Sequence, residues 1–432
     1  MSPLPAALAR ATFPGPVLEV LSALDRAGHR SFLVGGAVRD LLLHRPREAQ
    51  DFDVATPATP EEVAALFRRV IPTGAAHGTV TVLLGDERIE VTTFRGEGAY
   101  VDGRRPESVV FHRDLEADLA RRDFTMNALA FDPIGRDFRD PFGGREDLRR
   151  RLVRAVGDPA ERFGEDGLRP VRAVRFAAQL GFALARTTRD AIPGALPIVR
   201  KVSRERIADE LGKLVVAPHA ARAVLLLAST GLAGELLPAL AERPPADVRH
   251  AARVLGRAPT EPAARFAALL HALPAPEVEA VLQALRLPRH TSEEASILVQ
   301  ALPCLHRRDP LPEGAAAVRR WLSGAGPDRA PTLLALLDAE AHDVPPSRAA
   351  SARAAVRRLR LAVDEVLRDE PPLSTQQLAL DGRAIMDVLG TGPGPHVGEA
   401  LRHLLDRVLD DPSQNTPAAL AEAVRRWWAA RL

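Results

Sequence analysis

The sequence of 432 residues contains a single cysteine, Cys304, and only two lysines, Lys201 and Lys213. One cysteine excludes an intrachain disulfide and a cysteine-based zinc cluster, and we expect Cys304 to be a small buried hydrophobe in a reducing compartment. No segment approaches the roughly 20 apolar residues that a membrane-spanning helix needs. The first residues lack a basic start followed by an apolar stretch, so we expect no secretory signal and a cytoplasmic location.

Two widespread phosphate-binding motifs are also missing. There is no GxGxxG segment after a strand and no GxxxxGK[ST] segment, so the Rossmann and P-loop classes have no support. The net charge of +2 is small for a protein with a nucleic-acid partner, and a GC-rich genome accounts for most of the arginines. Only arginines inside motifs carry functional information, because their planar donors suit phosphates and base edges.

What is present divides into two architectures. Residues 28–155 mix short β-branched runs, glycine turns and helical patterns, whereas the sequence after about residue 160 reads as one helix after another. With 46% hydrophobic and 26% charged residues, the chain has the composition of a soluble globular protein of two or three domains. The later helices are separated by proline-bearing connections near 243–248, 308–312, 343–346 and 371–372.

Local signals place the elements of the first half. Gly35-Gly36 stands between a strand and a helix, a turn at residues 85–87 joins two strands in a hairpin, and Thr59 begins a helix with a capping box and a proline at the first helical position. The expected elements are strands at 31–34, 51–54, 79–84 and 88–94, and a helix at 37–43.

Asp51 and Asp53 are two positions apart in an expected strand. Because side chains alternate along a strand, both carboxylates point to one face. Like charges this close need a cation between them, and oxygen ligands suit Mg²⁺. An isolated pair of this kind is more often an exposed strand end, but the Gly35-Gly36 turn and the helix after it favour a phosphate cradle. The sequence therefore predicts a magnesium site beside a substrate phosphate.

Phosphoryl transfer between two metals usually needs a third carboxylate from a neighbouring strand. Glu90 is our candidate, because it lies on the face opposite Ile89 and Val91 in the second strand of the hairpin. The alternative is that Glu90 belongs to a solvated strand face, since the spacing does not fix the direction of that face.

A third polar cluster, residues 121–127, precedes an apolar run. Arg122 suits phosphate oxygens, whereas Asp123 and Asn127 suit sugar hydroxyls, so the cluster is suited to a ribose and a triphosphate. The alternative role of Asp123 is to cap a helix that begins there.

A fourth cluster spans residues 165–176, where Asp166, Arg169 and Arg172 share one helix face. The buried stripe expected from 100° per residue consists of Leu168, Val171, Val174 and Ala178. One interpretation is a surface salt bridge between Asp166 and Arg169. The other is base recognition, because a carboxylate acceptor beside a guanidinium donor matches the edges of cytosine and adenine but not those of uracil and guanine. Two mismatches would reject UTP or GTP by about 30-fold to 10⁴-fold.

Together these segments resemble the class II tRNA nucleotidyltransferase and poly(A) polymerase family, in order and spacing, from about residue 30 to 215. The matching segments are 33–42 (LVGGAVRDLL), 51–54 (DFDV), 121–129 (RRDFTMNAL), 140–148 (DPFGGREDL), 165–176 (EDGLRPVRAVRF) and 203–214 (SRERIADELGKL). A weaker likeness at 380–394 (LDGRAIMDVLGTGPG) extends toward the end of the chain.

The resemblance implies an α+β fold for an N-terminal polymerase-β-like nucleotidyltransferase head, followed by an all-α neck, body and tail. The implied domains are a catalytic head at 1–155, a neck for base recognition at 156–220, a tRNA-binding body at 221–372 and a tRNA-binding tail at 373–432. It also implies that Asp51 and Asp53 ligate Mg²⁺. The residues implied to contact the incoming CTP or ATP are Gly36, Arg39, Arg122, Asp166, Arg169, Arg172 and Arg175.

The implied reaction is attack of the tRNA 3′-hydroxyl on the nucleotide α-phosphate, with pyrophosphate leaving. The implied partner is the acceptor arm and 3′ end of tRNA, and we expect no membrane and no obligate protein partner. Complete CCA addition, A addition after a separate CC-adding enzyme, and poly(A) synthesis compete. Residues 92–111 resemble the flexible loop of CCA-adding and A-adding enzymes, so we choose complete CCA addition, with A addition second. The non-enzymatic alternatives are an inert tRNA-binding protein and a nucleotide-binding regulator.

Some members of the family carry a metal-dependent HD phosphohydrolase module in the C-terminal half. The nearest segment here is 269–272 (LLHA), with Ala272 where that motif needs aspartate. We therefore expect no such activity, and we expect His271 to be a packed core residue. The spacing of His112, His250 and His290 is not that of metal ligands.

Overall fold

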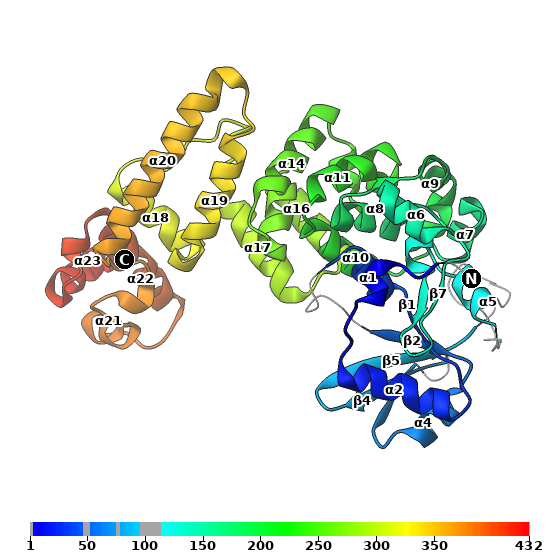
Figure 1. The fold of residues 1–432 in the computed structure, drawn as a ribbon. Coiled ribbons are helices and arrows are strands. Elements are labelled where there is room, and N and C mark those ends of the chain that lie inside the picture. Colours follow the sequence, from blue (N-terminus) through cyan, green and yellow to red (C-terminus); the bar gives the residue numbers. More distant parts are fainter. Residues whose placement is uncertain (1–2, 46–51, 75–77, 96–113, 432) are drawn as a thin grey trace. The chain divides into compact units, whose positions relative to one another are not determined.

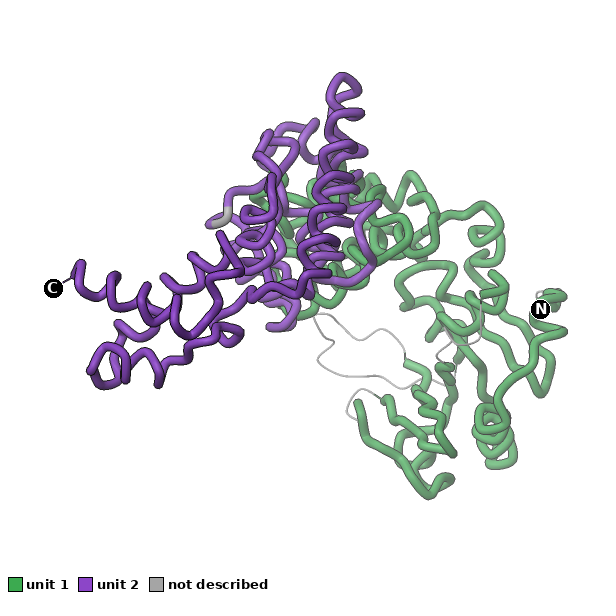
Figure 2. The backbone as a smooth tube through the Cα atoms, turned by 90° about the vertical axis from the view of Figure 1, so that its left-hand side faces the viewer, with its two compact units in different colours: residues 1–241 green, residues 242–432 purple. Residues whose placement is uncertain are grey.

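The computed structural model describes residues 3–431 apart from 46–51, 75–77 and 96–113 (Figure 1). It divides into two compact units, Met1–Ala241 (unit 1) and Glu242–Leu432 (unit 2), which Figure 2 colours separately. The strands that the structure describes all belong to unit 1, whereas the regular elements described in unit 2 are helices. The predicted change from a mixed to a helical architecture is confirmed, and the domain boundaries at 155, 220 and 372 stay predictions.

A seven-stranded sheet forms the first part of unit 1, with the order β3-β4-β5-β2-β1-β6-β7 (Figure 1). Its strands are β1 (Phe32–Val34), β2 (Asp53–Thr56), β3 (Val70–Gly74), β4 (Thr79–Leu84), β5 (Glu87–Thr93), β6 (Ala130–Asp132) and β7 (Asp137–Arg139). The strands β2 and β5 pair in parallel, and the other neighbouring strands pair antiparallel. This topology places β5 directly beside β2, although two strands and a helix separate them in the sequence.

The local signals of the sequence produce the expected elements. The chain turns at Gly35, with φ at 68°, and α3 (Gly36–Leu42) follows β1. The Thr59 capping box opens α4 (Pro60–Leu66), with the Glu62 amide donating to Thr59 Oγ1 at 3.3 Å and the Thr59 amide donating to Glu62 Oε2 at 2.8 Å. The strands β4 and β5 form the predicted hairpin, and α4 packs against both.

Helices make up most of the rest of unit 1. They are α1 (Ala6–Ala9), α2 (Gly15–Arg26), α5 (Leu115–Ala120), η3 (Thr125–Asn127), α6 (Gly144–Arg150), α7 (Pro159–Glu165), α8 (Arg169–Leu180), α9 (Arg186–Val199), α10 (Arg204–Val215), α11 (Ala220–Ser229), α12 (Leu232–Leu236) and α13 (Pro238–Ala241). A short parallel pair, β8 (Leu152–Val153) with β9 (Ala183–Leu184), interrupts the continuous helical region expected after residue 160. It forms because the chain turns back at Gly181 in the left-handed region and the Ala183 amide donates to the Arg151 carbonyl at 2.9 Å.

The helix predicted across the fourth cluster is in fact broken after Glu165. Asp166 follows the end of α7, and its side chain accepts from the Leu168 amide at 3.0 Å before α8 begins at Arg169. A Cβ on Gly167 would lie 2.5 Å from the Ile198 carbonyl oxygen, so the close approach of α9 requires glycine at the break. The helix-face argument for Asp166 was therefore wrong. The predicted stripe of Leu168, Val171, Val174 and Ala178 is buried, as expected.

Unit 2 is a succession of helices. They are α14 (Pro245–Arg257), α15 (Pro262–Leu270), α16 (Ala275–Leu285), α17 (Arg289–Ala301), α18 (Ala315–Ala325), η4 (Pro327–Arg329), α19 (Ala330–Ala341), α20 (Pro346–Arg368), η5 (Thr375–Gln377), α21 (Gly382–Leu389), α22 (Pro395–Asp410), η6 (Pro412–Gln414) and α23 (Pro417–Ala429). Cys304 is buried as predicted, and burial raises the pKa of its thiol to about 12. A search of the described helices finds none long and apolar enough to cross a membrane.

Two histidines of unit 2 lie close together in the fold. His271 is buried, as predicted for a core residue. His250 Nε2 lies 3.1 Å from His271 Nε2, a contact that the sequence spacing did not indicate. His250 lies on α14 and His271 directly follows α15, so their spacing in the sequence does not reveal the contact.

Candidate active site

Gly35 and Arg122 form a close contact at the start of α3. A Cβ on Gly35 would lie 2.9 Å from Arg122 Nη1, and the positive φ of this residue also favours glycine. Arg122 in turn donates from Nη2 to Asp118 Oδ2 at 3.3 Å. Gly36 is less constrained, because a Cβ there would make only an ordinary contact of 3.7 Å with Arg39 Nη2. Arg122, which belongs to the polar cluster at residues 121–127, therefore packs against the Gly35 turn.

A chain of hydrogen bonds connects three elements that are far apart in the sequence. Arg39 on α3 donates from Nη1 to Asn127 Oδ1 at 2.8 Å, and Asn127 donates from Nδ2 to Asp123 Oδ1 at 2.9 Å. Arg172 on α8 donates from Nε and Nη2 to Asp123 Oδ2 at 2.8 and 2.6 Å. The fold thus brings together four of the residues predicted to bind the nucleotide, and Asp123 is at their centre.

Asp123 is buried but ionised. Burial alone would raise the pKa of its carboxyl, but the charge of Arg172 and the hydrogen bonds from Asn127 and Arg172 hold the pKa below its usual value. The alternative that Asp123 caps a helix is wrong, because Phe124 occupies the N-cap position of η3 and no side chain caps it. Asp123 instead fixes the orientation of the Arg172 guanidinium.

The same network extends along α8 to a residue that the sequence reasoning missed. Glu210 on α10 accepts from Arg175 Nε at 2.5 Å, and its other oxygen lies 3.5 Å from Arg172 Nη1. The Arg175 guanidinium also lies 3.7 Å from the centre of the Phe176 ring. Helical periodicity could have revealed Glu210 as a buried acidic residue, because it falls within the apolar stripe of α10 that contains Leu211 and Leu214.

Asp166 and Arg169 have separate partners, so the simple salt bridge between them is not formed. Arg206 donates from Nη2 to Asp166 Oδ2 at 2.8 Å. Arg169 is paired with Glu165 and donates from Nη2 to the Arg121 carbonyl at 2.9 Å. Both side chains are thus held in place before any ligand binds, which is what selective hydrogen bonding to a base requires.

Asp53 and Glu90 lie side by side in the sheet. They are register partners on the parallel strands β2 and β5, so their side chains leave the sheet on the same face. Both line a pocket of about 430 Å³, together with the hydroxyl-bearing Thr73 and Thr81. Asp51 lies outside the described residues. The pairing of Asp53 with Glu90 supports the predicted direction of Glu90, and its role as a metal ligand stays a prediction.

Two family models match the chain at these places. The Poly A polymerase head domain matches residues 31–154, which include Asp53, Glu90 and Asp123 but not Arg172. The model described as "Probable RNA and SrmB- binding site of polymerase A" matches residues 181–243.

Curated relatives match over nearly the whole chain. The CCA-adding enzyme of Geobacillus stearothermophilus is 41% identical over 398 residues, which cover 92% of this chain and 93% of the relative. The chain belongs to the CCA-adding enzyme family. The member of this family from Lactobacillus delbrueckii subsp. bulgaricus is 37% identical, over 94% of this chain and 96% of its own length.

A solved structure of the CCA-adding enzyme family has the same fold. The crystal structure of the Bacillus stearothermophilus CCA-adding enzyme in complex with CTP matches with a TM-score of 0.77 at 37% identity, over 97% of this chain and 99% of that chain. The family resemblance and the fold class inferred from the sequence are confirmed. The roles of individual site residues stay predictions, and most of the loop predicted at 92–111 lies outside the described residues.

Proposed function

We propose that the protein is a template-independent tRNA nucleotidyltransferase that adds CCA to the tRNA 3′ end from CTP and ATP and releases pyrophosphate. The observation that carries the proposal is the match over 92% of the chain to a CCA-adding enzyme, with four of the predicted nucleotide-binding residues joined in one network. The match of residues 181–243 to an RNA-binding model supports an RNA substrate.

The residues around Asp53 fit a magnesium ion. Carboxylates and hydroxyls are hard oxygen ligands, and Asp53 and Glu90 share one face of the sheet and one pocket. Asp51 and Asp53 would hold the ion, with Glu90 as the third carboxylate. The bound metal supplies positive charge that favours the ionised 3′-hydroxyl and the leaving pyrophosphate.

The arginines and polar side chains would position the nucleotide. Arg122 and Arg39 lie beside the glycine turn and offer guanidinium donors to phosphate oxygens. Asp123 and Asn127 lie between these arginines and α8, where they suit the ribose hydroxyls. The chain of hydrogen bonds from Arg39 through Asp123 to Arg172 supports this assignment of phosphate and sugar contacts.

Base selection would come from Asp166 and Arg169. A carboxylate acceptor and a guanidinium donor match the amino group and ring nitrogen that cytosine and adenine share. The present partners of these residues, Arg206 and Glu165, would keep both side chains oriented when the base is absent. Uracil and guanine would leave buried groups unpaired, which costs about 1–3 kcal/mol for each group.

The decisive experiment offers the purified protein Mg²⁺, all four NTPs and one of two tRNAs, ending either at the discriminator base or in CC, and sequences the products. Complete CCA on the first tRNA is the expected result. A single A on the second tRNA alone would indicate an A-adding enzyme, and long A tracts would indicate a poly(A) polymerase. No extension of either tRNA would overturn the proposal in favour of an inert tRNA-binding protein.

A further inference from the structure

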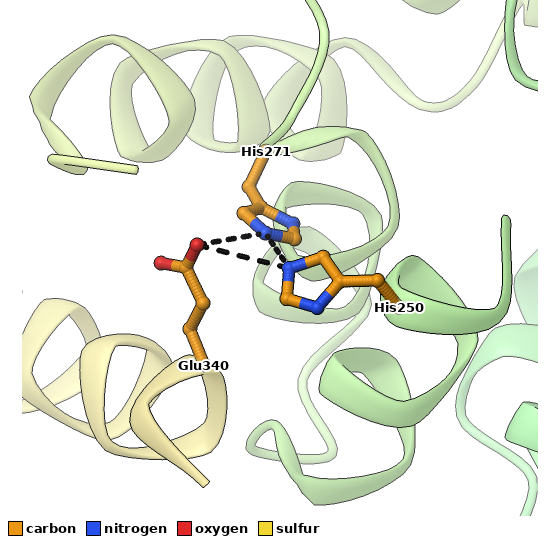
Figure 3. Close-up of side chains that lie close together, drawn as sticks. All are labelled: His250, His271 and Glu340. Atoms are coloured by element: carbon orange, nitrogen blue, oxygen red, sulfur yellow. Dashed lines mark hydrogen bonds and ion pairs between the residues drawn. The ribbon is translucent and has the colours of Figure 1, made fainter. Parts of the chain in front are cut away.

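Three side chains from three helices of unit 2 converge on one buried point (Figure 3). His250 lies on α14, His271 directly follows α15, and Glu340 lies on α19. Their exposed fractions are 2%, 1% and 0%, so solvent cannot stabilise charge at this point. The proposed nucleotidyltransferase reaction uses none of the three residues.

The partners of the two histidines fix which ring nitrogens face the cluster. Asp343 Oδ2 lies 2.6 Å from His250 Nδ1, and the Ala268 carbonyl lies 2.8 Å from His271 Nδ1. A carboxylate and a carbonyl oxygen only accept, so both Nδ1 atoms donate. In the neutral rings, both Nε2 lone pairs are therefore directed at the same point as Glu340 Oε1. Histidine ligands of metals are oriented in this way, by an acceptor on the ring nitrogen that does not bind the metal.

The distances between the three atoms match a metal ion. The separations are 3.1 Å between the two Nε2 atoms, 3.3 Å from His271 Nε2 to Glu340 Oε1 and 3.8 Å from His250 Nε2 to Glu340 Oε1. The point in the plane of these atoms that is equidistant from them lies about 2.0 Å from each. A tetrahedral ion would lie slightly out of this plane, with bonds slightly longer than about 2.0 Å and still close to those of zinc to histidine nitrogen or carboxylate oxygen. The geometry points to a second metal site in this protein, in which His250, His271 and Glu340 bind one divalent transition-metal ion, with zinc as the ion that fits best.

The carboxylate of Glu340 provides an independent argument for a cation. Its Oε2 atom is buried and has no hydrogen-bond partner among the described residues. Oε1 accepts from the His306 amide at 2.7 Å and from the Cys304 thiol at 3.4 Å, but the ion-pair partners described for Glu340 are the two histidines alone. A buried carboxylate that has no permanent cation beside it is costly. A divalent ion would supply the missing charge.

The ligand set selects the kind of metal. Two imidazole nitrogens and one carboxylate oxygen suit zinc, whereas magnesium prefers oxygen ligands alone. Three protein ligands leave a fourth tetrahedral position for water. Because α14, α15 and α19 each supply one ligand, the ion would hold these three helices together.

The first test measures metal binding by the full-length protein after dialysis against a chelator. Zn²⁺ is titrated calorimetrically, and metal content is then determined by mass spectrometry. We expect one zinc ion per chain at this site, with a Kd below about 1 µM. Asp53→Asn should retain the ion, which separates this site from the proposed magnesium site. Failure to bind zinc tightly in the wild-type protein would overturn the inference, whatever the nucleotidyltransferase assay shows.

Variants then assign the ligands. His271→Gln and Glu340→Gln should each weaken zinc binding by roughly 100-fold, and Asp343→Asn, which affects only the orientation of His250, by roughly 10-fold. His290→Gln changes an exposed histidine of the same unit and should leave the affinity unchanged. Unaltered zinc binding in both ligand variants would refute the site and favour a hydrogen-bonded histidine pair that shares a proton.

A measurement on the wild-type protein covers the case in which the ligand variants do not fold. Cobalt(II) replaces zinc and gives strong visible absorption only in a tetrahedral site, so its spectrum reports the coordination directly. We expect this absorption, its displacement by Zn²⁺, and a Tm that rises by about 5 °C at saturating zinc. The weak spectrum of a six-coordinate cobalt ion, with no change in Tm, would contradict the proposal.

Discussion

The two units contain buried acidic side chains in opposite electrostatic settings. In unit 1, Asp123 is paired with Arg172, and Glu210 is paired with Arg175. In unit 2, Glu340 faces His250 and His271, and one of its carboxylate oxygens has no described partner. The first arrangement is balanced by permanent cations, whereas the second is not.

This difference separates positioning groups from ligand-binding groups. A carboxylate paired with arginine holds that arginine in a fixed orientation, which suits the recognition of a nucleotide. Carboxylate oxygens and imidazole nitrogens that converge on one point with no arginine or lysine nearby instead favour the binding of a metal cation. Asp53 and Glu90 in unit 1 offer oxygen ligands alone, on one face of the sheet. The chain would thus distinguish magnesium in unit 1 from zinc in unit 2 by ligand chemistry.

The largest expected effect is on the rate of nucleotide addition, and it comes from removing a carboxylate that is proposed to bind the metal in unit 1. Asp53→Ala should lower the rate of nucleotide addition by about 10³-fold, because one metal ligand contributes several kcal/mol to the transition state. The fold should persist, as judged by circular dichroism. Asp86→Ala, at an exposed position in the β4–β5 turn, serves as the matched control and should keep its activity. A near-normal rate for Asp53→Ala would remove the metal assignment.

The next largest effect is on the free energy of unfolding, and it tests the ion pair between Asp123 and Arg172. Asp123→Ala would leave the partly buried Arg172 with only the more distant Glu210, and we expect the free energy of unfolding to fall by about 3 kcal/mol. Asp190→Ala removes a carboxylate from an exposed cluster with Arg186 and Arg189, so its effect should stay within about 0.5 kcal/mol. Urea denaturation compares the two variants. Equal losses would show that burial does not distinguish these ion pairs.

The sequence predicted those features that depend on neighbouring residues. The capping box at Thr59, the turn at Gly35 and the change from mixed to helical structure follow from local composition and periodicity. The break before α8 was missed because it depends on the approach of α9 to Gly167. The contact of Asp123 with Arg172 was also out of reach, since it joins a loop to a helix across the fold.

Polar clusters within one strand or helix were easier to predict than clusters built from several helices. Asp51 and Asp53 could be proposed as a pair from the sequence, because residues two positions apart on an expected strand share a face; their shared role stays a prediction. The histidine cluster was not recognised, because each of its ligands comes from a different helix and its carboxylate is a glutamate without a motif. Clusters within one element are visible in sequence patterns, whereas clusters assembled by helix packing become visible only in the structure.

A smaller effect is expected on nucleotide choice. Arg169→Ala removes one of the two groups proposed to read the base, so discrimination of CTP and ATP against UTP and GTP should fall by about 30-fold. Binding of tRNA should change much less. Arg186→Ala, which alters a side chain that is 89% exposed, is the control and should keep the selectivity. Unchanged selectivity in Arg169→Ala would contradict the proposed recognition, and a loss of tRNA binding alone would place Arg169 in the RNA contact.

The smallest effect is a pH dependence confined to unit 1. Burial would raise the pKa of Asp118, but the charges of Arg122 and Arg121 and the hydrogen bonds from Arg121 and Arg95 hold it below the usual value. A carboxyl with a lowered folded-state pKa stabilises the fold above its unfolded-state pKa, and this contribution is lost as the pH falls through the folded-state value. Asp118→Asn should therefore be about 1 kcal/mol less stable than the wild type at neutral pH, and this difference should shrink below about pH 4.

The tryptophans allow this pH dependence to be assigned to one unit. Trp321, Trp427 and Trp428 are the three tryptophans of the sequence, and all lie in unit 2. In an acid titration, the wild type and Asp118→Asn should differ in circular dichroism, which reports both units, and agree in tryptophan fluorescence. A shift of the fluorescence transition with Asp118→Asn would show that the two units unfold together. Identical circular dichroism curves would show that the arginines around Asp118 add nothing to acid stability, and the contrast between carboxylates paired with arginine and Glu340 would then have no energetic basis at this position.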